Sequence, residues 1–134
     1  MKTKYIDTNY FLRLVLQDNL EQCLIVNNIF AEATKNKLHL YTSSLVVCEC
    51  EWVLKSFYKF TKDNLIETLS KILSVRSIEF QDFDCLKVAV SNMQNNNLGL
   101  EDNYHIAYCL VKKMDFESFD KKAVAGYKKL VKKV

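Results

Sequence analysis

The chain has 134 residues, of which 49% are hydrophobic and 26% are charged, with a formal net charge of +3. These values are typical of one globular domain with its own core, and they exclude a disordered chain. No stretch approaches about 18 consecutive apolar residues, so we expect no contact with a membrane. The first residues lack the apolar core of a signal peptide, and the five cysteines lack the spacing of a zinc site or a disulfide framework, so we expect a cytoplasmic protein.

Short apolar runs alternate with segments of helical periodicity along the chain. The apolar runs predict strands over residues 4–7, 38–41, 77–80 and 115–119. The periodic segments predict helices over residues 8–16, 19–35, 44–58, 61–74, 84–95, 100–113 and 121–131. This alternation favours an α/β fold around a parallel sheet, in which functional sites collect at the carboxyl ends of the strands. Asp7 and Asp120 are expected at such ends.

Two segments have a biased composition. Three asparagines followed by Leu98 and Gly99 predict a loop over residues 95–99. Residues 121–134 contain six lysines and no acidic residue. This basic segment suits a polyanionic substrate, and it equally suits a solvated helix face that keeps the protein in solution.

Four acidic residues lie on or beside apolar segments, and they are Asp7, Glu49, Asp102 and Asp120. Burying a carboxylate in such a setting costs free energy unless a hydrogen-bond partner, an opposite charge or a metal ion compensates its lost hydration. We interpret the four as ligands around one shared pocket for a divalent cation, and hard oxygen donors favour Mg²⁺ or Mn²⁺ over zinc. For Asp102 alone, the alternative is an acid at a helix start that the helix dipole stabilises.

Glu49 and Glu51 are alternatives for the second position. They are about 200° apart on a helix, so only one of them can face the pocket. Leu45 and Trp52 lie one turn to either side of Glu49 and predict that its face packs inward, with Trp52 in the core. Glu51 precedes Lys55 by four residues, which is a common exposed pairing. We therefore choose Glu49.

The motifs of other α/β enzymes are missing. Residues 7–10 contain no glycine, which excludes the phosphate-binding turn of a dinucleotide fold and a P-loop. A phosphoaspartyl hydrolase usually has a second aspartate where this chain has Asn9. We find neither a glycine-flanked nucleophile nor a histidine–aspartate relay. Metal-assisted hydrolysis by carboxylates is the chemistry that remains.

Four segments in order resemble the motifs of the PIN-domain family, a nuclease fold that includes the VapC-type toxins of bacterial toxin–antitoxin pairs. They are the strand with its aspartate at residues 5–9, the acidic helix with Trp-Val-Leu at 42–54, Asp-x-x-His-x-Ala at 102–107, and Ser-Phe-Asp with basic residues at 118–122. The resemblance covers nearly the whole chain. It implies one PIN-like domain over residues 1–134, with a three-layer α/β/α fold and a central, mostly parallel sheet of about four to five short strands.

The resemblance also implies the activity. The protein is expected to be a Mg²⁺-dependent endoribonuclease that cuts single-stranded or loop RNA and leaves 5′-phosphate and 3′-hydroxyl ends. The implied metal ligands and catalytic residues are Asp7, Glu49, Asp102 and Asp120. Asn9 and Ser118 are candidates to orient a ligand or a bound water, and Glu101 is a candidate to assist as a further ligand.

The expected partners are RNA, an antitoxin peptide that lies over the pocket, and a second copy of the chain. Family members often form dimers through helices near the N-terminal half, and here the apolar face of residues 20–33 suits this role or a place in the core. This face comprises Leu20, Leu24, Ile25, Ile29 and Phe30. Two alternatives stay open: a catalytically silent module that binds RNA or protein, and a housekeeping or DNA-directed nuclease outside any toxin pair.

Overall fold

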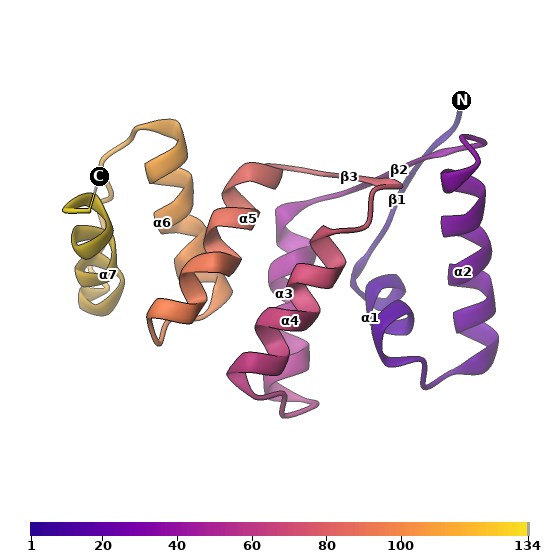
Figure 1. The fold of residues 1–134 in the computed structure, drawn as a ribbon, viewed down its shortest axis with the longest axis horizontal. Coiled ribbons are helices and arrows are strands. Elements are labelled where there is room, and N and C mark those ends of the chain that lie inside the picture. Colours follow the sequence, from indigo (N-terminus) through magenta and orange to yellow (C-terminus); the bar gives the residue numbers. More distant parts are fainter. Residues whose placement is uncertain (134) are drawn as a thin grey trace. The chain divides into compact units, whose positions relative to one another are not determined.

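The fold is seen in a computed structural model that describes residues 1–133. The chain divides into two compact units, which we call unit 1 (Met1–Phe83) and unit 2 (from Asp84 onward). Figure 1 shows the elements of both units in the order of the chain. None of the helices in the described part is long and apolar enough to cross a bilayer.

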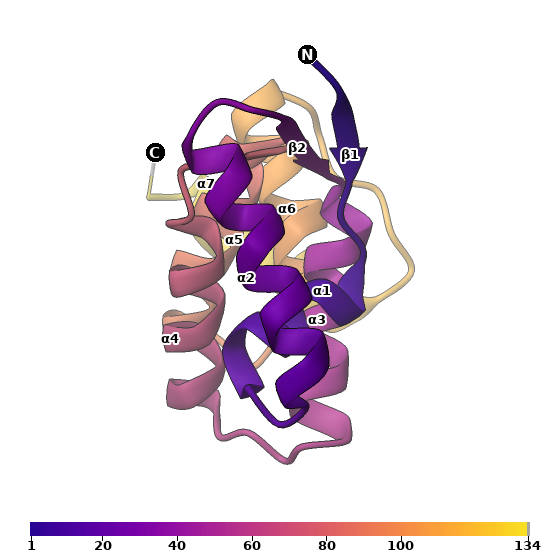
Figure 2. The same cartoon turned by 90° about the vertical axis from the view of Figure 1, so that its right-hand side faces the viewer.

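Unit 1 is built on a parallel sheet with the strand order β1-β2-β3. The strands are β1 (Thr3–Tyr5), β2 (His39–Thr42) and β3 (Ile78–Phe80). In the register of the sheet, Leu40 of β2 lies between Lys4 of β1 and Ile78 of β3. Because Leu40 is completely buried at the centre of this sheet, it fixes which face of β2 meets the core. Figure 2 shows β1 beside β2.

Four helices connect and cover these strands, because parallel strands need helical crossovers. They are α1 (Thr8–Leu16), α2 (Leu20–Thr34), α3 (Ser44–Ser56) and α4 (Lys62–Leu73). Helix α1 packs against both α2 and α3, and α3 packs against α4 (Figures 1 and 2). Each helix begins at a side chain that accepts a hydrogen bond from the first turn, and these caps are Asp7, Asn19, Ser43 and Thr61. Such a cap contributes about 1 kcal/mol to the stability of its helix.

Unit 2 contains helices and no strand among the residues that the structure describes. Its elements are α5 (Phe83–Asn92, which starts at the last residue of unit 1), the short 3₁₀-helix η1 (Met93–Asn95), α6 (Leu100–Lys112) and α7 (Lys121–Val131). Helix α7 packs against α6. A Cβ atom at Gly126 would lie 3.0 Å from Leu98 Cδ1 and 3.5 Å from Ile106 Cδ1, so glycine at this position lets α7 approach its neighbours closely.

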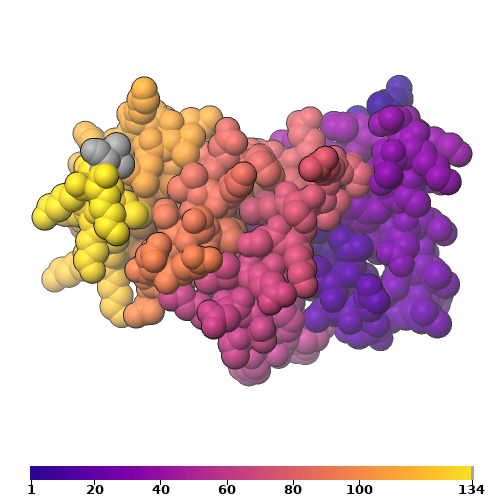
Figure 3. All heavy atoms as spheres, viewed as in Figure 1, coloured from indigo at the N-terminus to yellow at the C-terminus, as the bar shows by residue number. Residues whose placement is uncertain are grey.

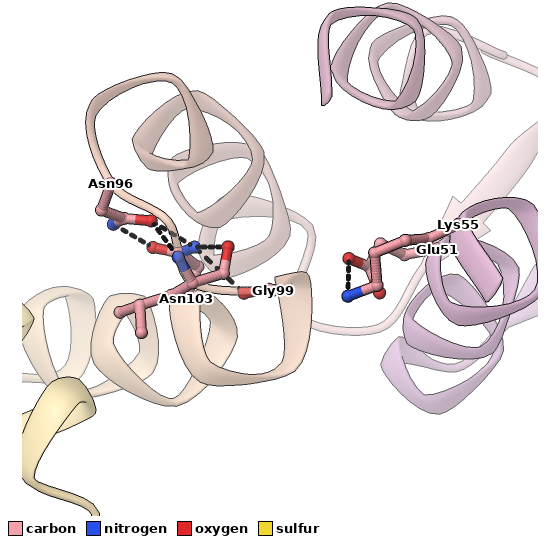
Figure 4. Close-up of polar contacts among 6 residues, drawn as sticks. Glu51, Lys55, Asn96, Gly99 and Asn103 are labelled. Atoms are coloured by element: carbon pink, nitrogen blue, oxygen red, sulfur yellow. Dashed lines mark hydrogen bonds and ion pairs between the residues drawn. The ribbon is translucent and has the colours of Figure 1, made fainter. Parts of the chain in front are cut away.

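One buried amide holds the loop before α6. Asn103 is completely buried and donates through Nδ2 to the backbone oxygens of Leu98 (3.2 Å) and Gly99 (3.0 Å). It also exchanges hydrogen bonds with the side chain of Asn96, at 2.8 and 3.1 Å (Figure 4). Asn96 in turn accepts from the backbone nitrogen of Leu98 at 3.0 Å. The predicted loop over residues 95–99 is therefore a rigid turn after η1.

We expect Asn103→Ala to destabilise the protein by about 2–4 kcal/mol, since it removes a buried side chain and leaves several polar groups without partners. Urea unfolding measures this change. Asn97→Ala is the matched control, because Asn97 is exposed in the same loop, and it should change the free energy of unfolding by less than about 0.5 kcal/mol. Equal, small effects of both substitutions would contradict the role that we give to Asn103.

The predicted α/β class with a parallel sheet is confirmed. All seven predicted helices are present, and the first three predicted strands form within two residues of their expected ends. The predicted strand over 115–119 is wrong, so the sheet of the described chain has three strands and not four or five. Ser118 Oγ accepts a hydrogen bond from the backbone nitrogen of Asp120 at 3.0 Å, and this local turn replaces strand pairing. Asp120 consequently does not follow a strand.

Candidate metal centre

The four predicted ligands are divided between the two units. Asp7 and Glu49 belong to unit 1, and Asp102 and Asp120 belong to unit 2. Each pair is therefore described within its own unit.

Asp7 follows β1 after one further residue, Ile6, whose backbone is fixed by two hydrogen bonds. Ile6 donates from its nitrogen to Tyr41 O at 2.8 Å and accepts at its oxygen from the buried Thr42 hydroxyl at 2.7 Å. The Asp7 carboxylate then caps α1, since its Oδ1 accepts from Tyr10 N at 3.4 Å. The side chain is exposed to solvent. The predicted position of Asp7 at the carboxyl end of a strand is confirmed.

Glu49 of α3 reaches the same corner of unit 1. Its Oε2 accepts a hydrogen bond of 2.7 Å from the hydroxyl of Thr8, the residue after Asp7. Burial raises the pKa of the Cys50 thiol to about 12. Negative charge on Glu49, then on Asp7 and on Cys48, raises this pKa further. Because Glu49 is hydrogen-bonded to the residue that follows Asp7, the two acids belong to the same corner of unit 1.

Glu51 occupies a different face of α3. Only 4% of its surface is exposed, and its Oε2 lies 3.3 Å from Lys55 Nζ (Figure 4). The pairing with Lys55 is confirmed, but the expectation that Glu51 is exposed is wrong. Leu45 and Trp52 are 65% and 63% exposed, so the expectations that the face of Glu49 packs inward and that Trp52 is a core residue are also wrong.

The reason is the position of the core stripe on α3. Val47, Cys50 and Leu54 are completely buried, and this stripe includes Glu51 and excludes Glu49. The whole Glu51 side chain is covered, and its carboxylate pairs with the half-exposed ammonium group of Lys55. The choice of Glu49 stays a prediction, and its hydrogen bond with Thr8 beside Asp7 is now its best support.

In unit 2, Asp102 lies in the first turn of α6 and is half-buried. The N-cap of this helix is Gly99, so Asp102 is not the capping residue, although the helix dipole favours an acid at its position. The neighbouring Glu101 is exposed, and its Oε1 lies 3.8 Å from Nε2 of His105, one turn further along. The imidazole of His105 therefore lies near a carboxylate on its own helix.

Asp120 caps α7, and its Oδ1 accepts from Ala123 N at 3.1 Å. Ser118 bonds to the backbone nitrogen of Asp120 and not to its carboxylate, so in this structure it shapes the turn. Asn9 is exposed in the first turn of α1. The proposed roles of Ser118 and Asn9 in orienting a ligand stay predictions.

The donors in unit 1 fit a hard divalent cation. Mg²⁺ is usually held by one or two protein carboxylates, with water and substrate phosphate completing its shell. Asp7 and Glu49 offer two exposed carboxylates in the same corner of unit 1, and oxygen ligands of this kind select Mg²⁺ or Mn²⁺. Among residues 1–133, no three histidine, cysteine, aspartate or glutamate side chains are grouped as ligands of one ion.

Sequence reasoning missed Thr8 and Thr42 as residues that support this corner. Thr8 holds the Glu49 carboxylate, and Thr42 holds the carbonyl of the residue before Asp7. A hydroxyl directly after Asp7 was visible in the sequence, but its partner is 41 positions away. Only the fold brings them together.

The sequence profile of the PIN domain matches residues 4–129, and the chain therefore belongs to the PIN-domain family. PIN domains have a three-layer α/β/α fold and are generally metal-dependent nucleases that use divalent ions. No curated protein and no solved structure matches the chain.

The cysteines offer a test of the packing around this corner. We expect iodoacetamide to label Cys48 and Cys109 faster than the buried Cys23, Cys50 and Cys85. Cys50 should resist even at pH 9, because a pKa of about 12 keeps its thiol protonated there and the thiolate is the reactive form. Peptide mass spectrometry measures the labelling, and the protein unfolded in urea is the control in which all five should react. Labelling of native Cys50 as fast as Cys48 would contradict this packing.

Proposed function

We propose that the protein is a Mg²⁺-dependent endoribonuclease that cuts single-stranded or loop RNA, with Mn²⁺ as an alternative cofactor. The observation that carries the proposal is a pair of exposed carboxylates in one corner of unit 1, in a chain of the PIN-domain family: Asp7 follows β1, and Glu49 of α3 accepts a hydrogen bond from the next residue, Thr8. The end of a strand in a parallel sheet is where α/β enzymes hold their ligands.

The residues of this corner have separate tasks in the proposal. Asp7 and Glu49 hold the cation, and Thr8 fixes the orientation of the Glu49 carboxylate through its hydrogen bond. When bound there, the cation would polarise a phosphate and lower the pKa of a water molecule. Asp102 and Asp120 are the further ligands that the family resemblance implies, and Glu101 is a candidate beside them. The exposed acids are accessible to an RNA strand from solution.

The test is cleavage of a labelled single-stranded RNA by the full chain, with Mg²⁺ and with a chelator. We expect cutting with Mg²⁺, none with the chelator, and products that carry 5′-phosphates. A duplex DNA and a single-stranded DNA of the same sequence separate a ribonuclease from a DNA-directed nuclease. RNA that is bound equally with and without the chelator, and never cut, would support the silent binding module instead.

We further propose that the protein is the toxin of a type II toxin–antitoxin pair. Leu45 and Trp52, exposed one turn to either side of Glu49, offer an apolar surface on which an antitoxin peptide can cover the acids. Expression of the chain should then arrest growth, and co-expression of the small protein encoded next to it should restore growth. Growth arrest by an Asp7→Asn variant as strong as that by the unaltered chain would count against a toxin that acts by cleavage.

A homodimer through α2 is the other proposed partnership. Phe30 is buried, whereas Leu20, Leu24 and Ile25 are largely exposed on the outer side of the helix. We expect Leu24→Glu, at a position 57% exposed, to convert a dimer into a monomer, because a carboxylate placed in an apolar interface loses its hydration. Sedimentation velocity measures the oligomeric state of the variant. Val131→Glu on α7 is the control, and equal behaviour of both variants would contradict an interface on α2.

A further inference from the structure

Unit 2 contains a cavity that none of the four acids lines. It has a volume of about 430 Å³, which falls within the range of about 300–1,000 Å³ of ligand pockets. Its walls come from the asparagine-rich loop after α5 and from one face of α7. Two features that the proposed catalytic chemistry leaves unused, the run of asparagines and the lysine-rich segment, therefore meet in one pocket.

The lysines on the wall form a helical stripe. Lys122, Lys129 and Lys133 line the cavity at helical spacing, with Gly126 between them. The described residues that line it include no acid, so the lysines give the pocket a positive potential. The other lysines of α7 (Lys121, Lys128, Lys132) lie outside the lining. Helix α7 is the yellow segment at the surface of unit 2 in Figure 3.

The opposite wall presents amides. Asn92, Asn95, Asn96 and Asn97 line the cavity beside the apolar Leu98. The Nδ2 of Asn92 is buried and has no hydrogen-bond partner within residues 1–133. Because this atom is inaccessible even to water, it cannot meet a ligand in the cavity, and the exposed Asn95 and Asn97 are the amides of this wall that a ligand can reach.

This wall is rigid before a ligand arrives. Asn103 is completely buried behind the loop and binds Asn96, Leu98 O and Gly99 O. Figure 4 shows this network of amide contacts. A wall held in this way loses little conformational entropy on binding, which favours affinity for a small ligand.

We propose that this cavity binds one nucleotide of a single-stranded RNA, with the phosphate against the lysines of α7 and the base against the asparagine amides. The proposal rests on the proposed function for its choice of RNA. Lysines attract phosphate as point charges, and asparagine amides supply both the donor and the acceptor that a base edge needs. Leu98 and Leu130 provide the apolar surface for the base.

An acidic peptide fits these observations less well. It would use the lysines, and its backbone offers donors and acceptors to the amides, but it lacks the flat apolar face that a base would lay against Leu98 and Leu130. We therefore commit to a nucleotide and make the acidic peptide an outcome of the test.

The experiment is calorimetric titration of the full chain, in chelator, with each of the four nucleoside 5′-monophosphates, with inorganic phosphate and with a polyglutamate peptide. At least one nucleotide should bind about tenfold more tightly than phosphate. The double variant Lys122→Gln/Lys129→Gln should weaken it by at least about tenfold. Lys121→Gln/Lys128→Gln, with the same change of charge on the same helix, should weaken it by less than about twofold.

Four outcomes overturn the proposal. They are the absence of nucleotide binding, phosphate bound as tightly as every nucleotide, equal losses in the two double variants, and peptide bound more tightly than nucleotide with loss in Lys122→Gln/Lys129→Gln. Asn95→Ala is a second test: it should weaken nucleotide binding with little change in Tm, because Asn95 is an exposed residue of the cavity lining. Unchanged nucleotide affinity in Asn95→Ala would also count against the pocket.

The failure of this inference can be told apart from failure of the proposed function. The titration needs neither a metal nor RNA cleavage. Nucleotide binding by a chain that never cleaves RNA would therefore support the proposed pocket and contradict the proposed nuclease activity. If the chain cleaves RNA and its pocket variants keep full nucleotide affinity, the proposed nuclease activity is supported and the proposed pocket is contradicted.

Discussion

Asp7→Asn should reduce RNA cleavage by at least roughly 10²–10³-fold and leave the fold intact. The substitution removes the negative charge of a residue that we propose as a ligand of the cation. Loss of one group that stabilises charge in the transition state typically lowers a rate by about 10²–10³-fold. Stability should hold, because asparagine caps a helix as well as aspartate and can still accept the hydrogen bond from Tyr10 N. Initial rates of RNA cleavage and urea unfolding of the same samples measure the two effects.

Asp63→Asn is the matched control. Asp63 is an exposed acid in the first turn of α4 in the same unit, and its loss should leave the cleavage rate within about twofold. Asp7→Ala adds a further comparison, since it removes the cap as well as the charge and should cost about 1 kcal/mol of stability. Full activity of Asp7→Asn would reject the assignment of Asp7.

Glu49→Gln and Glu51→Gln should have opposite effects. Glu49 is exposed, so Glu49→Gln should lower the cleavage rate by roughly 10²–10³-fold with little change in stability. Glu51 is buried against Lys55, so Glu51→Gln should cost about 1–2 kcal/mol of stability while the folded enzyme stays active. Cleavage rates and unfolding free energies of both variants measure this pattern, and the reverse pattern would move the ligand role to Glu51.

The helices and the first three strands were predictable because each depends on local signals. Short apolar runs and helical periodicity appear directly in the sequence. The segment 115–119 shows the limit of such signals. Its two phenylalanines suggested a strand, but Phe119 is fully exposed and the backbone of Asp120 bonds to Ser118. Pairing partners are a property of the whole fold.

The site could be predicted only in part, for the same reason. Asp7 is set by its local position after β1 and before α1, which the sequence displays. The side of α3 that meets the core depends on tertiary packing, so the exposure of Trp52 and the burial of Glu51 were both expected wrongly. The hydrogen bond between Thr8 and Glu49 joins two helices and spans 41 positions of the sequence, so no local sequence pattern predicts it.

The most direct measurement of the central claim, that Asp7 and Glu49 hold a divalent cation, is the line broadening of backbone amide NMR signals by Mn²⁺. A paramagnetic ion in this corner should broaden the amides of Thr8 and Cys50 first, excess Mg²⁺ should reverse the effect, and Asp7→Asn should weaken it strongly. Broadening that begins elsewhere in the chain, or that persists unchanged in Asp7→Asn, would contradict the account.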